Sequence, residues 1–417
     1  MSEQIPQTDI VVLGAGMVGA SLVHLLQPAL QSGLTLTLID RQPLQWDGDI
    51  SQRPPSFDGR ATALSYGTQQ ILSHIGVWPQ MQERACAIEH IQVSDQGRFG
   101  QTHLHASEQH TDVLGYIVEN AVIGQGLLSG LHQTGVNIMA PAEVSRISMN
   151  AGGARLTFAD GSQLQTSLLV MADGARSPLA AQLGIQHERT RYGTHALVTQ
   201  VETDRHHDYW AYERFSHDGP IAFLPLQTHQ YAVVWTLADD LIDEVMALPD
   251  EAMLARLQSQ IGHRLGTLLR AGQRQSYPLT LVRSKEQVRR SLVLLGNAAH
   301  SLHPVAGQGF NLALRDTAVL AEYLNRAWVA GQPLGDLALL QAYERQQQAD
   351  QRNTIGASDL LPRIFGSRSA AVGVLRDAGL FGMSALPVVR RLFTRHAMGL
   401  GQRAAKLMPA AAVSTGE

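Results

Sequence analysis

The hydrophobic positions at the start of the chain predict a strand, a turn, a helix and a second strand. Residues 10–13 (Ile-Val-Val-Leu) form a continuous apolar run, as expected of a strand buried on both faces of a parallel sheet. A helical pattern covers residues 17–26, and Pro28 is expected to end it. Residues 34–39 are expected to form the next strand, which leads into Asp40. These elements predict a β-α-β unit in the first 40 residues.

The middle of the chain has a different pattern. Between residues 187 and 285 polar and apolar positions alternate, for example over 209–215, 221–226 and 231–236. This alternation is typical of an antiparallel sheet with one covered face. Strand patterns also occur near 168–172 and 292–295. We therefore expect the sheet domain to be inserted into a discontinuous first domain.

After about residue 310 the pattern is helical to the end of the chain. Between residues 361 and 406 there are eight basic residues and one acid, Asp377, with apolar residues between them. One interpretation is a helix that binds a membrane surface or a protein partner. The other is a helix that packs on the core with a solvated arginine face. The sequence leaves both open.

Composition excludes several classes of protein. The chain has 417 residues, 44% hydrophobic and 16% charged, which is typical of a globular protein with more than one domain. A net charge of −4 gives no reason to expect nucleic acid as a partner. One cysteine, Cys86, precludes an intramolecular disulfide and is expected to be a small core residue. No run of 18 apolar residues occurs, and we expect a cytoplasmic protein.

The turn after the first strand carries a dinucleotide fingerprint. Gly14 permits the tight turn, Gly16 lets the backbone approach a pyrophosphate, and Gly19 lets helix and strand pack closely. The helix N-terminus offers N–H groups to phosphates. Asp40, next to Arg41, is placed to accept hydrogen bonds from a ribose. The alternative is a purely structural glycine turn, and the motif does not separate NAD from FAD.

Two later motifs follow buried strands. The first is Asp173-Gly174 after the apolar run 168–171. The second begins with Gly296-Asn297 and continues through residues 304–311. Its glycines allow a flat ring to approach the backbone, and a helix starting near Asn311 would stabilise negative charge on a reduced flavin. A glycine-rich loop before an ordinary helix would give the same pattern.

Together the three motifs resemble those of the class A flavoprotein aromatic hydroxylases, the family of p-hydroxybenzoate hydroxylase, over most of residues 5–350. The resemblance implies an α/β fold: a Rossmann-like FAD-binding domain (1–75, 110–186 and 286–345), an inserted, mostly antiparallel substrate domain (76–109 and 187–285), and C-terminal helices (346–417). The residues that it implies for FAD binding are Gly14, Gly16, Gly19, Asp40, Arg41, Arg60, Asn120, Asp173, Gly296, Asn297, Pro304, Gly307, Gly309, Phe310 and Asn311. Asn297 stands where the family usually has Asp, and Ala180 where it usually has Arg.

Finer features resemble the ubiquinone-biosynthesis hydroxylases, above all the 2-polyprenyl-6-methoxyphenol 4-hydroxylases. They include Tyr212-Glu213-Arg214-Phe215 and the run 219–226. This resemblance implies an FAD that NADPH or NADH reduces and that reacts with O2 to give a C4a-hydroperoxyflavin, which hydroxylates the phenol at C4. It further implies a polyprenyl phenol substrate and allows a place in a quinone-biosynthesis complex or a peripheral contact with the inner membrane.

Individual catalytic residues are harder to assign. His303 and Pro304 are candidates for the flavin face, and His300 lies beside them in the sequence. Phe223, Leu224 and Pro225 are candidates for the substrate pocket from the position of their strand. The histidines at 103, 105, 110, 206 and 207 lack the spacing of a metal site, and we predict none.

Three alternatives to the C4 hydroxylase stay open at this point. The first is a sister enzyme that acts at another ring position. The second is a flavin-dependent dehydrogenase or prenyl reductase on the same fold. The third is a non-catalytic scaffold of the quinone-biosynthesis complex, against which the complete fingerprint argues.

Overall fold

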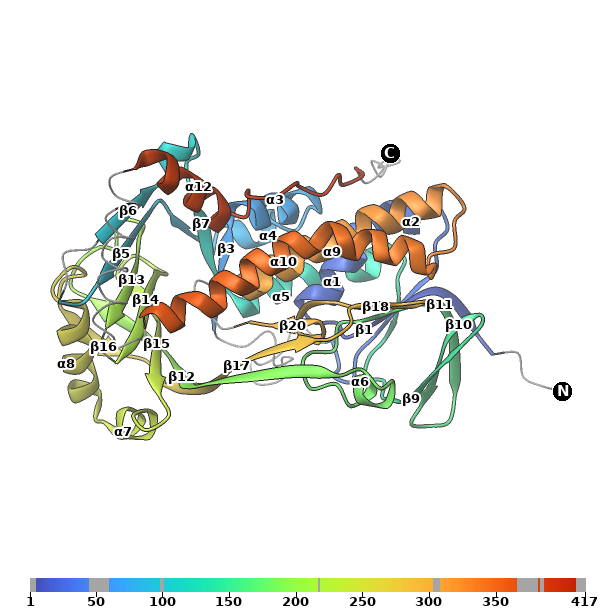
Figure 1. Cartoon of the computed structure of the whole chain (residues 1–417), viewed down its shortest axis with the longest axis horizontal. Coiled ribbons are helices and arrows are strands. Elements are labelled where there is room, and N and C mark those ends of the chain that lie inside the picture. The colour runs from blue at the N-terminus through green and yellow to red at the C-terminus, as the bar shows by residue number, and fades with distance from the viewer. Residues whose placement is uncertain are drawn as a thin grey trace.

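The structure is a computed structural model that describes residues 5–44, 60–97, 101–216, 218–302, 308–365, 382 and 386–409. Two large sheets occupy opposite ends of the molecule, and long helices lie along them (Figure 1). The predicted α/β class with a helical C-terminal region is confirmed.

The described residues form an eight-stranded sheet around the first strand. Its main path runs β18-β19-β11-β1-β2-β8, and β10 and β9 extend it from β11. Strands β19, β11, β1, β2 and β8 are parallel to one another. The bounds are β1 Gln7–Leu13, β2 Leu36–Ile39, β8 Asn137–Met139, β9 Val144–Asn150, β10 Gly153–Phe158, β11 Gln163–Met171, β18 Val288–Arg289 and β19 Leu292–Leu294.

Strand β1 is apolar throughout because both of its faces are covered. Ile10 and Val12 join the core cluster formed with the helices. Val11 and Leu13 join a second cluster, formed with β9, β10 and the short helix α6 (Pro178–Gln182). A strand buried on both faces needs side chains of this kind at every position.

Helices cover the first of these faces. Helix α1 (Met17–Leu25) and the long helix α9 (Gln308–Val329) pack against each other. Helix α1 ends before Pro28, as expected, but the chain continues as a short helix, α2 (Gln27–Gln31). Pro28 lies in the first turn of α2, where a missing N–H costs no hydrogen bond.

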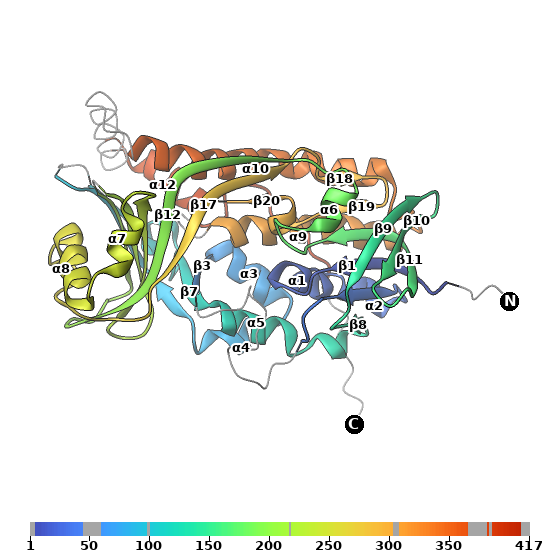
Figure 2. The same ribbon diagram turned by 90° about the horizontal axis from the view of Figure 1, so that it is seen from below.

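The inserted sheet is also confirmed, with nine strands in the part of the chain that the structure describes. Its order is β20-β17-β12-β15-β14-β13-β5-β6, with β16 beside β12. Strands β12 and β17 run side by side from this sheet toward the other end of the molecule (Figure 2). The bounds are β5 His90–Asp95, β6 Gln101–His105, β12 His187–Thr203, β13 Trp210–Ser216, β14 Gly219–Pro225, β15 Gln230–Ala238, β16 Leu268–Ala271, β17 Gln275–Ser284 and β20 His300–Ser301.

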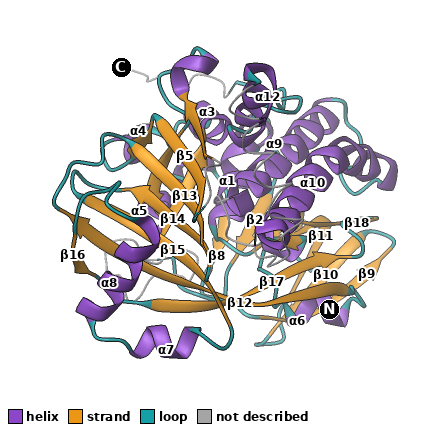
Figure 3. Cartoon of the chain, turned by 60° about the vertical axis from the view of Figure 1, so that its left-hand side comes forward, coloured by secondary structure: helices purple, strands orange, loops and turns teal. Residues whose placement is uncertain are grey.

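One face of the nine-stranded sheet is covered by α7 (Ile242–Ala247) and α8 (Asp250–Ile261), as Figure 3 shows. Tyr231, Val233 and Trp235 of β15 point into the core between this face and the helices. Because side chains alternate along a strand, residues of the opposite parity point to the other face. That other face is turned toward a small sheet of β3 (Ala61–Ser65), β7 (Gly115–Glu119) and β4 (Cys86–Ile88).

Several shorter elements complete the described fold. They are the helices α3 (Tyr66–His74), α4 (Pro79–Gln82) and α5 (Asn120–Leu128), and the 3-10 turns η3 (Ala106–Gln109), η4 (Leu131–Thr134) and η5 (Gly296–Ala298). Helix α10 (Leu337–Phe365) runs along the molecule and α12 (Pro387–Ala397) lies near β6 and β7 (Figure 1). Helix α10 continues through residue 345, where we expected one domain to end.

Candidate functional site

The turn between β1 and α1 is built from glycines that other residues could not replace. Gly14 has φ +102°, and a Cβ there would lie 2.6 Å from the carbonyl oxygen of Ala172 at the end of β11. A Cβ on Gly19 would lie 1.9 Å from the carbonyl oxygen of Gly14. Gly16 is the N-cap of α1, and among the described residues no side chain caps that helix. Its first N–H groups therefore point toward the turn, where they can bind an anion.

Asp40 lies at the carboxyl end of β2, beside this turn. Its Oδ2 accepts a hydrogen bond from the backbone N–H of Ala15 (2.7 Å), and its Oδ1 accepts one from Gln42 (2.8 Å). A carboxylate has about four acceptor positions, so two oxygens with one bond each can still accept hydroxyl donors. The neighbouring Arg41 is exposed.

Asp173 lies at the carboxyl end of β11, on the other side of Gly14. Its Oδ1 is buried and has no hydrogen-bond partner in the described structure. Burial raises the pKa of this carboxyl to about 6, and the Asp40 carboxylate also raises it. A buried acceptor without a partner fits a ligand that brings its own donor.

Arg60 and Asn120 meet where the small sheet begins. The backbone N–H of Asn120 donates to the carbonyl of Arg60 (2.7 Å), and its Oδ1 accepts from Thr62 (2.6 Å). The guanidinium of Arg60 lies 4.8 Å from the centre of the Tyr277 ring on β17. Arg60 therefore stands between the first domain and the nine-stranded sheet, where its charge could meet a phosphate of a bound cofactor.

The third motif begins directly after β19. Gly296 has φ +57°, and a Cβ there would lie 2.8 Å from a methyl of Val18 on α1, so glycine lets the motif approach the fingerprint helix. Asn297 is exposed. His303, Pro304 and Gly307 lie outside the described residues. A Cβ on Gly309, in the first turn of α9, would meet no described atom within 4 Å.

Asn311 and Phe310 have structural contacts in this fold. The Asn311 amide donates to the carbonyl of Ala63 (2.8 Å) and accepts from the N–H of Ser65 (2.9 Å), which ties α9 to β3. Phe310 packs against the first core cluster. Both side chains thus help to hold the start of α9 in place.

The sequence did not predict a buried polar network that joins the third motif to α9 and α10. Nε2 of His300 lies 2.7 Å from Oδ2 of Asp316 on α9, and both side chains are almost fully buried. The amides of Gln347 and Gln351 on α10 donate to the same carboxylate (2.7 and 2.9 Å). Asp316 lies among apolar residues of a predicted helix, and an acid in such a place could have indicated a buried polar contact.

The three substrate candidates do not share one face of the sheet. Leu224 packs toward β3, β4 and β7. Phe223 is fully buried on the opposite face, in the cluster with α8. Pro225 has the same parity as Phe223 along β14. The structure brings Leu224 to the side of the small sheet and Phe223 away from it.

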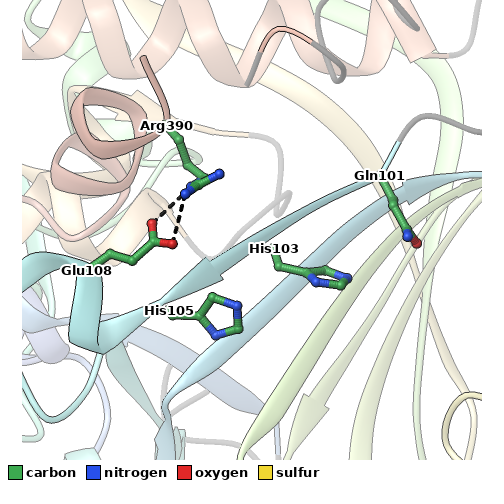
Figure 4. Close-up of a pocket in the computed structure, with 5 residues that line it drawn as sticks. All are labelled: Gln101, His103, His105, Glu108 and Arg390. Carbon is green, nitrogen blue, oxygen red and sulfur yellow. Dashed lines mark hydrogen bonds and ion pairs between the residues drawn. The ribbon is translucent and has the colours of Figure 1, made fainter. Parts of the chain in front are cut away.

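Some of the remaining histidines line a pocket of about 350 Å³ between β6 and α12 (Figure 4). Its lining is polar: Gln101, His103, His105, Glu108 and Arg390. Burial lowers the pKa of His103, and the neighbouring His105 lowers it further. Within the described ranges no three His, Cys, Asp or Glu side chains gather in a way that could hold a metal ion.

The residues around β1 fit FAD. The uncapped start of α1, the glycine contacts, the remaining acceptor positions of Asp40 and the orphaned oxygen of Asp173 lie at the carboxyl ends of adjacent parallel strands. Ligands of open α/β sheets bind at this edge. The site could therefore hold a pyrophosphate at α1 and a ribose at Asp40.

Comparison with known proteins agrees with this geometry. Residues 7–356 match the family described as FAD binding domain. The chain is 35% identical over 404 residues to the ubiquinone hydroxylase UbiL of Rhodospirillum rubrum, covering 96% of this chain and 92% of that one. It is 28% identical over 397 residues to the 3-demethoxyubiquinol 3-hydroxylase of Escherichia coli, covering 94% and 99%.

Solved structures share the fold at lower identity. The p-nitrophenol 4-monooxygenase PnpA of Pseudomonas putida superposes with a TM-score of 0.75 at 18% identity, covering 96% of this chain and all of that one. PqsL of Pseudomonas aeruginosa, a probable FAD-dependent monooxygenase, gives 0.73 at 20%, covering 90% and 99%. The chain belongs to the FAD-binding monooxygenases and, within them, to the flavin-dependent hydroxylase family that contains the ubiquinone hydroxylases.

Proposed function

We propose that this protein hydroxylates a polyprenylated phenol of ubiquinone biosynthesis, with 2-polyprenyl-6-methoxyphenol as the substrate and C4 as the position. The observation that carries the proposal is the 35% identity to a ubiquinone hydroxylase over 96% of this chain, and the glycine contacts around α1 support it because they fit a bound FAD. NADPH or NADH would be the reductant and O2 the co-substrate. One of the two hydroxylases compared above is named for position 3 and the other for no position, so our proposal of C4 rests on the sequence motifs at residues 212–215 and 219–226.

The protein's own residues have binding and positioning roles in this reaction. When FAD is bound, it supplies the redox chemistry that activates O2. The turn at Gly14 and the start of α1 would hold its pyrophosphate, and Asp40 its ribose. We place the FAD-binding domain in residues 1–75, 110–186 and 286–345 and the substrate domain in residues 76–109 and 187–285. The nine-stranded sheet supports this division because it contains strands from both substrate segments.

Deletion of the gene from its bacterium tests the pathway and the position together. Mass spectrometry of quinone intermediates is expected to show a polyprenylphenol that lacks the C4 hydroxyl. An intermediate that lacks another hydroxyl would reassign the position and keep the pathway. A normal ubiquinone profile would remove the pathway, and product formation that does not consume O2 would point to the dehydrogenase alternative.

We also propose a peripheral contact with an anionic membrane, through α12. This helix packs with its polar side inward. Thr394 is 2% exposed, and the guanidinium of Arg390 makes two hydrogen bonds of 2.9 Å with the Glu108 carboxylate, drawn in Figure 4. The amide of Gln109 donates to the carbonyl of Arg391 (3.3 Å). These contacts fix which side of the helix faces outward.

The outward side of α12 is apolar with basic residues beside it. Of the large apolar side chains exposed on the described residues, five lie in one stretch: Leu386, Val388, Val389, Leu392 and Phe393. Val388 is 70% exposed and Leu392, one helical turn later, is 64% exposed. Arg391 and Arg395 are exposed beside them, and α12 contains no acid. An apolar stripe with flanking arginines is typical of helices that lie in a membrane interface.

Substitutions in α12 test this contact. Leu392→Gln is expected to reduce co-sedimentation of the holoenzyme with phosphatidylglycerol vesicles, whereas Leu269→Gln, at an exposed leucine on β16, is not. Binding of the wild type should weaken with salt. If vesicles bind equally well with either variant, or do not bind at all, the membrane contact is wrong and a protein of a quinone-biosynthesis complex becomes the better partner. No described helix is long and apolar enough to span a bilayer.

A further inference from the structure

The face of the nine-stranded sheet opposite α7 and α8 is only partly covered by other described elements. At one edge of this face, Tyr277 lies under the guanidinium of Arg60. Farther across the face, on the inner strands β13 and β14, Ala211 and Leu224 contact the cluster around β4 and β7. The face is thus turned toward the elements that carry Arg60 and Asn120, where the cofactor is expected.

A row of paired residues crosses this face from β12 to β5. Val198 pairs with Val234, Val234 with Ala222, Ala222 with Glu213, and Glu213 with Val93. Four of the five are apolar, and none of these four belongs to a packed apolar cluster of the described residues. Ala222 is buried, and the other three are half-buried. The row therefore has the composition of a flat, apolar binding surface with one carboxyl in it.

The orientation of Glu213 follows from the strand register. Its neighbours Tyr212 and Arg214 point to the α8 side, where Tyr212 packs in the core and Nη1 of Arg214 donates to Ser94 (3.1 Å). Glu213 has the opposite parity and shares its face with Ala211. No hydrogen bond or ion pair joins its carboxyl to another described residue. A carboxyl without a partner in apolar surroundings is costly and marks a candidate functional group.

We propose that Glu213 is a catalytic base that accepts the phenolic proton of the substrate, an inference that rests on the hydroxylase function proposed above. The phenol O–H proton passes to a Glu213 oxygen, and the freed electron pair on the phenol oxygen moves into the ring. The para carbon thereby becomes more nucleophilic toward one oxygen atom of O2, which FAD reduced by NAD(P)H would activate. The new C–O bond forms as the O–O bond breaks, and the other oxygen atom leaves as water. The para carbon then releases its hydrogen to solvent as a proton, and the original phenol oxygen regains a proton from Glu213.

The acidity of Glu213 suits this role. Burial raises the pKa of its carboxyl from 4.5 to about 7, and no charged group contributes to that shift. Each pKa unit is a tenfold change in the proton-transfer equilibrium, so the shift makes transfer from a phenol roughly 300-fold more favourable. Among the described residues of the adjacent strands, Asp95 on β5 is the other carboxyl on this face, and Tyr277 and Arg60 lie at its far edge.

The test compares Glu213→Gln with two control variants. Glu188→Gln removes an exposed carboxyl of β12 that is paired with Arg283, and Asp95→Asn removes the other carboxyl of this face. All variants should retain FAD, judged from the flavin spectrum, and NADH oxidation without substrate. Hydroxylation of a short-chain 2-prenyl-6-methoxyphenol is measured from pH 6 to 9. For the wild type and Glu188→Gln, the rate should rise through about pH 7.

We expect Glu213→Gln to lose that rise and to slow hydroxylation by roughly 100-fold or more, the usual effect of removing a general base. A ring-fluorinated phenol, which ionises more readily, should recover part of the rate, as a merely structural defect would not allow. In a binding assay the wild type should prefer the phenol over its methyl ether by about tenfold, and Glu213→Gln should lose most of this preference.

Wild-type rates and pH profile in Glu213→Gln would overturn the inference, as would loss of the pH 7 limb in Asp95→Asn alone. A wild-type protein that binds the phenol but does not hydroxylate it would refute the proposed function instead. The comparison of phenol with methyl ether would then still decide whether Glu213 recognises the phenolic hydroxyl.

Discussion

Gly19→Ala has two opposing effects: alanine favours the helix, but its Cβ overlaps the carbonyl oxygen of Gly14 in the glycine-rich turn. Residue 19 lies inside α1, where alanine is about 1 kcal/mol more favourable than glycine. The new Cβ would lie 1.9 Å from the carbonyl oxygen of Gly14, about 1.5 Å short of the 3.4 Å at which such contacts become ordinary. Both atoms are fixed by the backbone, so a rotamer change cannot relieve the overlap, and α1 must shift.

Such overpacking costs about 3 kcal/mol at the upper end of the usual range, which leaves a net loss of about 2 kcal/mol after the helix term. This loss should lower the unfolding temperature of the apoprotein. Because the start of α1 would hold the pyrophosphate, FAD affinity should also fall, by at most roughly 30-fold, since binding costs no more than the strain of returning α1 to its original position. Flavin fluorescence titration and thermal unfolding measure the two effects.

Gly356→Ala is the matched control, because Gly356 is exposed in α10 and a Cβ there meets no described atom within 4 Å. It should leave FAD affinity unchanged and raise stability slightly. If Gly19→Ala bound FAD within threefold of the wild type without loss of stability, the close approach of α1 to the turn would not matter, and our reasoning about the fingerprint would be wrong.

Three further predictions concern buried polar groups. Since the pKa of Asp173 is raised to about 6, the folded apoprotein keeps a proton that the unfolded chain loses, and the free energy of unfolding should fall as the pH rises from about 4 to about 6. Asp173→Asn should flatten this part of a plot of unfolding temperature against pH, whereas Asp160→Asn, at an exposed turn, should leave the fall in place. Burial raises the pKa of Cys86 to about 12, so iodoacetamide at pH 8 should label it only after unfolding; rapid labelling of the native protein would contradict this. Asp316→Asn places an amide N–H against donors from His300 and α10, so the free energy of unfolding measured in urea should fall by about 3 kcal/mol. An unchanged urea midpoint would show that the network adds little to stability.

The sequence by itself determined the parts of the protein that depend on local stereochemistry. Gly14 and Gly19 are needed because the turn has a positive φ and because helix and strand approach closely, and both reasons can be read from spacing. The apolar run of β1 and the alternation of residues 209–236 likewise predicted a doubly covered parallel strand and a half-covered sheet. These patterns follow from side-chain periods that every strand obeys.

Only the tertiary structure decided which polar residues are buried and which side of an element faces the site. Asp316 can be buried because its partners arrive from α10, and Glu322 because Arg403 and the N–H of Lys406 reach it from more than 80 residues away. The register of β13 and β14 puts Glu213 and Phe223 on opposite faces of their sheet, and packing shows that α8 covers the face of Phe223. In α12 the Glu108–Arg390 pair holds the apolar side outward. Each of these outcomes depends on long-range partners, which the periodicity of one segment does not contain.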